Sequence, residues 1–312
     1  MPPGGHMQIR SARSLGLLAA VVLSATGLGV TSGCGNQQEA DGSAQESDSD
    51  REAQPHRARQ VAAAWDGSPA AAAWRAGYHP MGDVVQLPRG GLRSRADEQA
   101  YEDRSFVLRV KLPATRPEDG RVAWAGGKTL TRPLEGADES YKALADEHAG
   151  ERPHLTVTKV KLGEMTVATS RGPAVVPAWM FTLDGYDSPL KRAAVIPSKL
   201  PQPPIGRARD VPGPPLHHLV RIAADGRSVT VVALHGVCDD GPAVDVLETR
   251  GSVVLSPSVK HRKHEGHCTK QGKLQQVTAK LDRPLGDRVL LDVITGRPIP
   301  YKPERGPSPS WS

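Results

Sequence analysis

Long basic runs and long apolar runs are both scarce in this sequence. No cluster of lysines and arginines with interleaved aromatic residues occurs, and aromatic residues make up only 4% of the chain. Nucleic acid is therefore not the expected partner. After residue 34 no apolar segment is long enough to cross a bilayer. The 312 residues carry 40 basic and 34 acidic side chains, a mild excess that permits attraction to anionic envelope polymers without requiring it.

Motifs that carry a catalytic nucleophile or bind a cofactor are also missing. There is no Gly-x-Ser-x-Gly elbow, no Ser-x-x-Lys with its companion motifs and no dinucleotide fingerprint. The segment 126–129, Gly-Gly-Lys-Thr, ends like a phosphate-binding loop, but the position that needs the first glycine is Val122. We therefore expect no cofactor. These absences argue against an enzyme, although a catalytic triad can assemble from distant residues without any motif.

Cysteine is limited to Cys34, Cys238 and Cys268. Cys34 is interpreted below as a lipid attachment site, which leaves the other two as a pair, and outside the cytoplasm such a pair oxidises. A catalytic or metal-binding pair typically lies closer together, as in Cys-x-x-Cys. We therefore expect a structural Cys238–Cys268 disulfide, whose loop of about 30 residues corresponds to about 3.5 kcal/mol in the chain-entropy model.

The one long apolar run lies near the N-terminus, over residues 15–34, and follows Arg10 and Arg13. It is rich in Gly, Ser and Thr and has no charged stop-transfer flank, so it indicates a secretory signal peptide over residues 1–33. Thr-Ser-Gly-Cys at its end resembles a lipoprotein cleavage box. We expect Cys34 to carry a diacylglyceryl group, whose two acyl chains suffice for stable anchoring. An ordinary signal peptide with an incidental cysteine is the alternative.

Removal of the signal takes away two arginines and no acid, which leaves 38 basic against 34 acidic side chains. Residues 34–57 contain no branched aliphatic or aromatic residue, so they cannot bury enough apolar area to offset ordering entropy. They predict a lipidated cysteine followed by a disordered tether. The Ala-rich segment after it predicts short helices, with Ser68 as N-cap and Gly77 as stop.

An N-terminal, mostly β domain with short helices is expected over residues 58–196. Trp65 and Trp74 are interpreted as anchors that dock its first helices on the following sheet. Residues 137–150 have helix-forming composition. Gly163 is placed at a hairpin turn, and segments rich in Val, Thr and aromatic residues predict strands over 104–112, 155–162, 164–170 and 174–183.

Residues 197–215 hold seven prolines and predict an extended linker. A C-terminal β-sandwich with the disulfide is expected over 216–303, because short strands alternate with turns such as Asp225-Gly226 and Arg250-Gly251. Residues 304–312 are expected to form a disordered tail. The predicted fold is thus mainly β with minor α: two antiparallel, sandwich-like parts, a short N-terminal helix and a Pro-rich connection.

Four pieces of the C-terminal part also carry a resemblance. They are Cys238 after a Gly-bounded strand, Asp-Val-Leu-Glu-Thr at 245–249, Gly-His-Cys-Thr at 266–269 and Pro-Leu-Gly-Asp-Arg-Val-Leu-Leu-Asp at 284–292. With the Ala-rich segment 65–78, these pieces resemble uncharacterised secreted lipoproteins of GC-rich actinomycetes. The resemblance implies a lipid anchor and a disulfide. It implies no activity, because that group has none assigned.

Histidines supply the candidate metal ligands. His261, His264 and His267 recur every three residues beside the second cysteine of the pair and could ligate zinc or copper. Their spacing fits neither His-Glu-x-x-His nor a zinc finger, so an exposed, solvated loop is the competing interpretation. His217 and His218 stand at the start of a predicted strand, where alternation should send their rings to opposite faces.

Together these features predict a lipid-anchored cell-envelope protein on the outer face of the cell membrane, acting by binding or structural association. Its expected partners are the membrane, through the lipid on Cys34, and an envelope protein or cell-wall polymer. One alternative is an extracytoplasmic hydrolase of envelope polymer or peptide, which requires a cleft with converging Ser, His or acid side chains. The other is a metal-binding lipoprotein that uses His261, His264 and His267.

Overall fold

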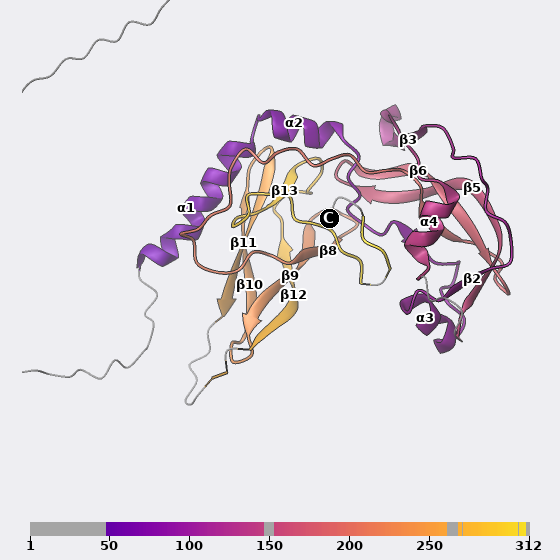
Figure 1. Ribbon diagram of the computed structural model, residues 1–312. Helices are drawn as coiled ribbons and strands as arrows, with labels where there is room; N and C mark the ends of the chain where they lie inside the picture. Colours follow the sequence, from indigo (N-terminus) through magenta and orange to yellow (C-terminus); the bar gives the residue numbers. More distant parts are fainter. Residues whose placement is uncertain (1–47, 147–152, 261–267, 270, 305, 310–312) are drawn as a thin grey trace, which may run out of the picture. The chain divides into compact units, whose positions relative to one another are not determined.

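The computed structural model describes residues 48–146, 153–260, 268–269, 271–304 and 306–309 (Figure 1). The protein is mainly β, as predicted. Its helices are α1 (Asp48–Trp65), α2 (Pro69–Ala76), α3 (Arg95–Glu102) and α4 (Ala137–Leu144), with a 3₁₀ turn at Ala125–Gly127. Its strands are β1 (Val85–Gln86), β2 (Phe106–Leu108), β3 (Gly120–Trp124), β4 (Thr129–Arg132), β5 (Leu155–Thr169), β6 (Gly172–Leu183), β7 (Leu190–Ala193), β8 (His218–Ile222), β9 (Ser228–Gly236), β10 (Gly241–Glu248), β11 (Ser252–Lys260), β12 (Gly272–Lys280) and β13 (Val289–Asp292).

Strands β1 to β7 form one sheet in the order β1-β7-β6-β3-β4, and β5 pairs with both β6 and β2. Its pairings are antiparallel except for β2 with β5, which is parallel. The long β5–β6 hairpin turns at residues 170–171, whereas a turn was expected at Gly163. That expectation is wrong, because β5 continues through Gly163 without a turn. The glycine leaves room for the Met180 side chain, since a Cβ at position 163 would lie 2.9 Å from Cγ of Met180.

The buried face of β6 changes along its length. Near its start Ala174, Val176 and Ala178 are buried, whereas Val175 is 41% exposed. Near its end the alternate set is buried, namely Trp179, Phe181 and Leu183. A strand with buried residues on both faces is typical of a strongly coiled sheet. In the same sheet, an isolated bridge between Pro80 and Thr169 links the end of β5 to the segment before β1.

Strands β8 to β13 form two three-stranded sheets, ordered β12-β9-β8 and β10-β11-β13. The predicted turns at Asp225-Gly226 and Arg250-Gly251 join β8 to β9 and β10 to β11. One pairing, β11 with β13, is parallel. The expected Cys238–Cys268 disulfide is present, with the two Cα atoms 6.1 Å apart, and a disulfide is compatible with an extracytoplasmic location.

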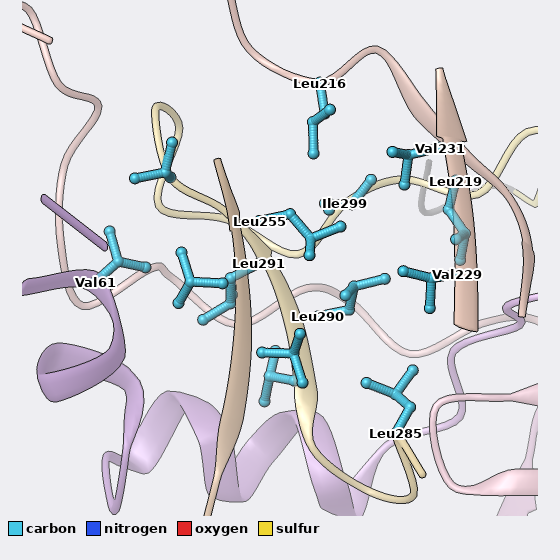
Figure 2. Packing of buried hydrophobic residues seen from close by; sticks show 14 of the residues in the cluster. Val61, Leu216, Leu219, Val229, Val231, Leu255, Leu285, Leu290, Leu291 and Ile299 are labelled. Atoms are coloured by element: carbon cyan, nitrogen blue, oxygen red, sulfur yellow. The ribbon is translucent and has the colours of Figure 1, made fainter. Parts of the chain in front are cut away.

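Helices α1 and α2 precede the β1–β7 sheet in the chain, but their apolar residues belong to the core of the β8–β13 part. Trp65 and Trp74 are fully buried there, and the Trp65 indole nitrogen donates to the Gly296 carbonyl at 2.8 Å. Figure 2 shows Val61 of α1 among side chains of this buried cluster, which also includes Leu255 of β11 and Leu291 of β13. The expectation that the tryptophans dock on the following sheet is therefore wrong. As predicted, Ser68 caps α2, its hydroxyl accepting from the Ala71 amide at 3.1 Å.

The start of α1 also differs from expectation, because the helix begins at Asp48, inside the segment 34–57 that composition assigned to a tether. Polar side chains rather than apolar ones hold this part. Gln54 donates to the carbonyls of Pro212 and Pro257, each at 2.9 Å, and Arg57 donates to the carbonyl of Val293 at 3.3 Å. Residues 1–47, with the predicted signal and Cys34, lie outside the described residues.

Candidate binding pocket

One concavity of the described residues, with a volume of about 680 Å³, combines apolar walls with several polar groups. Four parts of the chain line it: the segment from Met81 to Tyr101, Ala168 of β5, strand β8, and residues Tyr301 and Glu304 near the C-terminus. Its apolar wall consists of Met81, Val85, Leu87, Leu92, Val220 and Ile222. We call this site the Asp83 pocket, after the carboxylate at its polar centre.

The segment that carries Asp83 is fixed on both sides. The Met81 amide donates to the Ala168 carbonyl at 2.8 Å, and Val85 pairs with Arg192 of β7. The side chains of Met81 and Val85 are buried, whereas Asp83 between them is exposed. The backbone is thus held in place while the carboxylate faces the pocket.

Helix α3 supplies Glu98 and Tyr101, which are three residues apart and therefore lie on one face of the helix. The Ser94 hydroxyl caps the helix by accepting from the Asp97 amide at 3.1 Å. Tyr101 is only 6% exposed and meets Phe106 edge to face. Tyr101 is consequently held by packing, and its hydroxyl is the part of the side chain that can serve a ligand.

The C-terminal segment forms the opposite wall by adding to the edge of β8. The Leu219 amide donates to the Pro300 carbonyl at 2.7 Å, and the Lys302 amide donates to the Leu219 carbonyl at 3.0 Å. Tyr301 between them is 4% exposed. Two residues later comes Glu304, which was expected to begin a disordered tail but lines the pocket and accepts from the Gln276 amide group at 3.2 Å.

Two tyrosines of the pocket lie close enough to Asp83 for its charge to act on them. The Tyr301 hydroxyl donates to Oδ1 of Asp83 at 2.5 Å. Burial, followed by this hydrogen bond and the charges of Asp83 and Glu304, raises the Tyr301 pKa far above its usual range. Burial and the Asp83 charge raise the pKa of Tyr101 to about 12. Both phenols therefore keep their protons at neutral pH, and the Tyr101 hydroxyl has no hydrogen-bond partner among the described residues.

The charge of the pocket is negative. Within the described part of the chain, its lining includes the carboxylates of Asp83, Glu98 and Glu304 and one basic group, the Arg221 guanidinium. Among the described residues, the lining contains no serine, cysteine or histidine. The pocket thus offers hydrogen-bond acceptors, phenols and apolar walls, which suit binding, and it brings together no nucleophile with a base.

The sequence-predicted site residues lie elsewhere. Cys34, His261, His264 and His267 fall outside the described residues. Within the part of the chain that the structure describes, no group of three or more His, Cys, Asp or Glu side chains could hold a metal ion. Cys238 and Cys268 are joined in a disulfide, as expected.

The expectation for the adjacent histidines is wrong. The Nδ1 atoms of His217 and His218 lie 2.6 Å apart, and their ring centroids are 4.9 Å apart. Strand β8 begins only at His218, so strand alternation does not govern His217. Burial, followed by the neighbouring charges of His217 and Lys302, lowers the pKa of His218.

Sequence reasoning singled out none of the residues of the Asp83 pocket. Asp83, Tyr101 and Tyr301 belong to no motif, and over 200 positions separate the first from the last. The only local signal was the spacing of Glu98 and Tyr101 on a short, capped helix. No protein-family model, curated protein or solved structure matches this chain.

Proposed function

We propose that this protein is a lipid-anchored component of the cell envelope that acts by binding a ligand in the Asp83 pocket. One observation carries the proposal: a tyrosine that is 6% exposed, whose hydroxyl has no hydrogen-bond partner among the described residues, lines an open pocket together with the carboxylate of Asp83. This hydroxyl is therefore available to a ligand. Apolar walls with a few convergent polar groups are typical of ligand sites.

The proposed location rests on the N-terminal sequence. Arg10 and Arg13, the apolar run and the small residues before Cys34 favour export and lipidation. The Cys238–Cys268 disulfide is compatible with that location. The described residues include no helix long and apolar enough to span a bilayer. The anchor would place the pocket on the outer face of the membrane, within reach of envelope proteins and cell-wall polymers.

A hydrolase remains a weaker candidate, since the groups with raised pKa in the pocket are tyrosines and not a nucleophile and its base. The metal-binding alternative depends on His261, His264 and His267, which lie outside the described residues. We therefore propose a binding function. The first partner is the membrane, through the lipid on Cys34, and the second is an envelope constituent.

Ligand binding predicts a stabilisation that depends on the pocket. The mature chain with Cys34→Ser is mixed with fractionated envelope constituents, and its thermal unfolding is followed. A fraction that contains the ligand raises the midpoint, because a ligand at about 100 times its Kd adds about 2.7 kcal/mol to the free energy of unfolding. Asp83→Asn and Tyr101→Phe should abolish this increase.

The matched control is Glu118→Gln, which removes one exposed carboxylate outside the pocket and should respond like the parent chain. The proposal fails if some fraction stabilises the parent and the two pocket variants equally. It also fails if no envelope fraction raises the midpoint at all.

A further inference from the structure

We infer that the Asp83 pocket selects a ligand that carries a protonated amine or guanidinium on an apolar stem. This inference rests on the proposed binding function and specifies its chemistry. The first support is charge, because three carboxylates face one guanidinium in the lining. A pocket with low-dielectric walls concentrates the field of such charges and favours a counter-charge within it.

The second support is the hydrogen-bonding character of the centre. An ionised carboxylate only accepts hydrogen bonds, and Asp83 uses one oxygen for the Tyr301 hydroxyl, which leaves the other oxygen free for a donor. Ammonium and guanidinium groups donate and never accept, so they are the functional groups that match acceptor-only partners. A carboxylate or phosphate ligand would instead face repulsion from Asp83, Glu98 and Glu304.

The third support is the Tyr101 hydroxyl. The residue is 6% exposed, lines the pocket and has no hydrogen-bond partner in the described parts of the chain. Its pKa is raised to about 12 by burial and the Asp83 charge, so it stays a neutral phenol whose oxygen lone pairs can accept from a cation. Tyr101 and Asp83 both line the pocket and both offer acceptors to a cationic ligand, and hydrogen bonds in which one partner is charged are stronger than neutral ones.

The fourth support is the apolar wall, which indicates that the rest of the ligand is apolar. Leu87 is 39% exposed, while Leu92, Val220 and Ile222 are half-buried around the pocket. Covering these side chains with an alkyl stem would contribute about 25 cal/mol per Å² of apolar surface removed from water. A small inorganic cation would leave this wall exposed, so the favoured ligand combines a cationic head with an apolar chain.

Calorimetric titration with three probes of equal length isolates the head group. The mature Cys34→Ser chain is titrated at pH 7 with n-hexylamine, n-hexanol and hexanoate. Hexylamine should bind about tenfold or more tightly than hexanol, which corresponds to about 1.4 kcal/mol, and hexanoate should bind more weakly than either. Asp83→Asn should abolish the preference for hexylamine over hexanol. The control Glu118→Gln should behave like the parent.

The other outcomes of the titration distinguish a failure of the cationic inference from a failure of the proposed binding function. Equal affinity for hexylamine and hexanol, or a preference for hexanoate, overturns the cationic inference while leaving ligand binding in the pocket intact. Binding of none of the three probes, in a protein whose thermal unfolding is unchanged, overturns the inference, and the envelope-fraction assay then decides on the proposed function separately. A second pair of probes, spermidine and the tripeptide amide Ala-Lys-Ala, distinguishes a free polyamine from a lysine side chain as the source of the amine.

Discussion

At the scale of single residues, His79 is a buried histidine with a lowered pKa. It is fully buried, and its ring stacks on Trp74 with the ring centroids 4.1 Å apart and an interplanar angle of 6°. Burial, followed by the positive charge of Arg132, lowers the pKa of His79 from its ordinary value of 6.5 to about 4. The stack between α2 and the segment before β1 thus depends on a neutral imidazole.

This lowered pKa predicts acid sensitivity. Between about pH 6.5 and pH 4 the unfolded chain binds a proton at His79 and the folded chain does not, so the free energy of unfolding decreases as the pH falls through this window. The full decrease from this one residue is about 3 kcal/mol. Between pH 7 and pH 4.5, urea unfolding should show a smaller decrease in the free energy of unfolding for His79→Phe, which retains an aromatic ring, than for the parent. An identical pH dependence of the two proteins would exclude His79 as the cause.

At the scale of elements, local signals were reliable where the cause of the structure is local. The cap of α2 by Ser68 and the turn at Asp225-Gly226 depend on neighbouring residues alone, and the structure contains both. The helix within 137–150 was also predicted, and α4 is found there. The turn at Gly163 failed because the reason for that glycine is a cross-strand neighbour, Met180, and the local sequence does not reveal such a contact.

The contact with Met180 allows a test of whether Gly163 is required for steric reasons or for its backbone conformation. Gly163→Ala should lower the free energy of unfolding by about 1–2 kcal/mol, because the new Cβ meets the Met180 side chain. In a chain that already carries Met180→Ala, the same substitution should cost much less, since the obstruction is gone. If Gly163→Ala is equally costly in both backgrounds, a backbone requirement at Gly163, as in a turn, would be the better explanation. Urea unfolding of the four proteins provides the comparison.

On the scale of the whole molecule, the sequence allowed the fold class to be predicted but not which segments pack together. Helices α1 and α2 stand next to the β1–β7 sheet in the chain, yet Trp65 and Trp74 belong to the core of the β8–β13 part. Apolar patterning shows that a helix face is buried and does not show against what. The same limit hid the pocket, because Asp83 meets Tyr301 only through long-range packing.

The composition of residues 34–57 illustrates a second limit. Within the described part of this segment, residues 48–57, no apolar side chain belongs to a core, but the hydrogen bonds of Gln54 and Arg57 to distant carbonyls still hold this part in α1. Composition estimates the apolar area available for burial and is insensitive to such polar contacts.

The disulfide was predictable because only two cysteines remained once Cys34 was assigned to lipid.

Photo-crosslinking in living cells tests the central claim, binding at the envelope through the Asp83 pocket, most directly. A photoreactive phenylalanine analogue replaces Leu87, which is 39% exposed at the pocket, or Val175, which is 41% exposed outside it. Binding through the pocket should give an adduct from position 87, recovered in the membrane fraction, that is lost with Cys34→Ser and weakened by Asp83→Asn. Adducts of equal yield from both positions, or an unchanged adduct in the Cys34→Ser and Asp83→Asn variants, would contradict it.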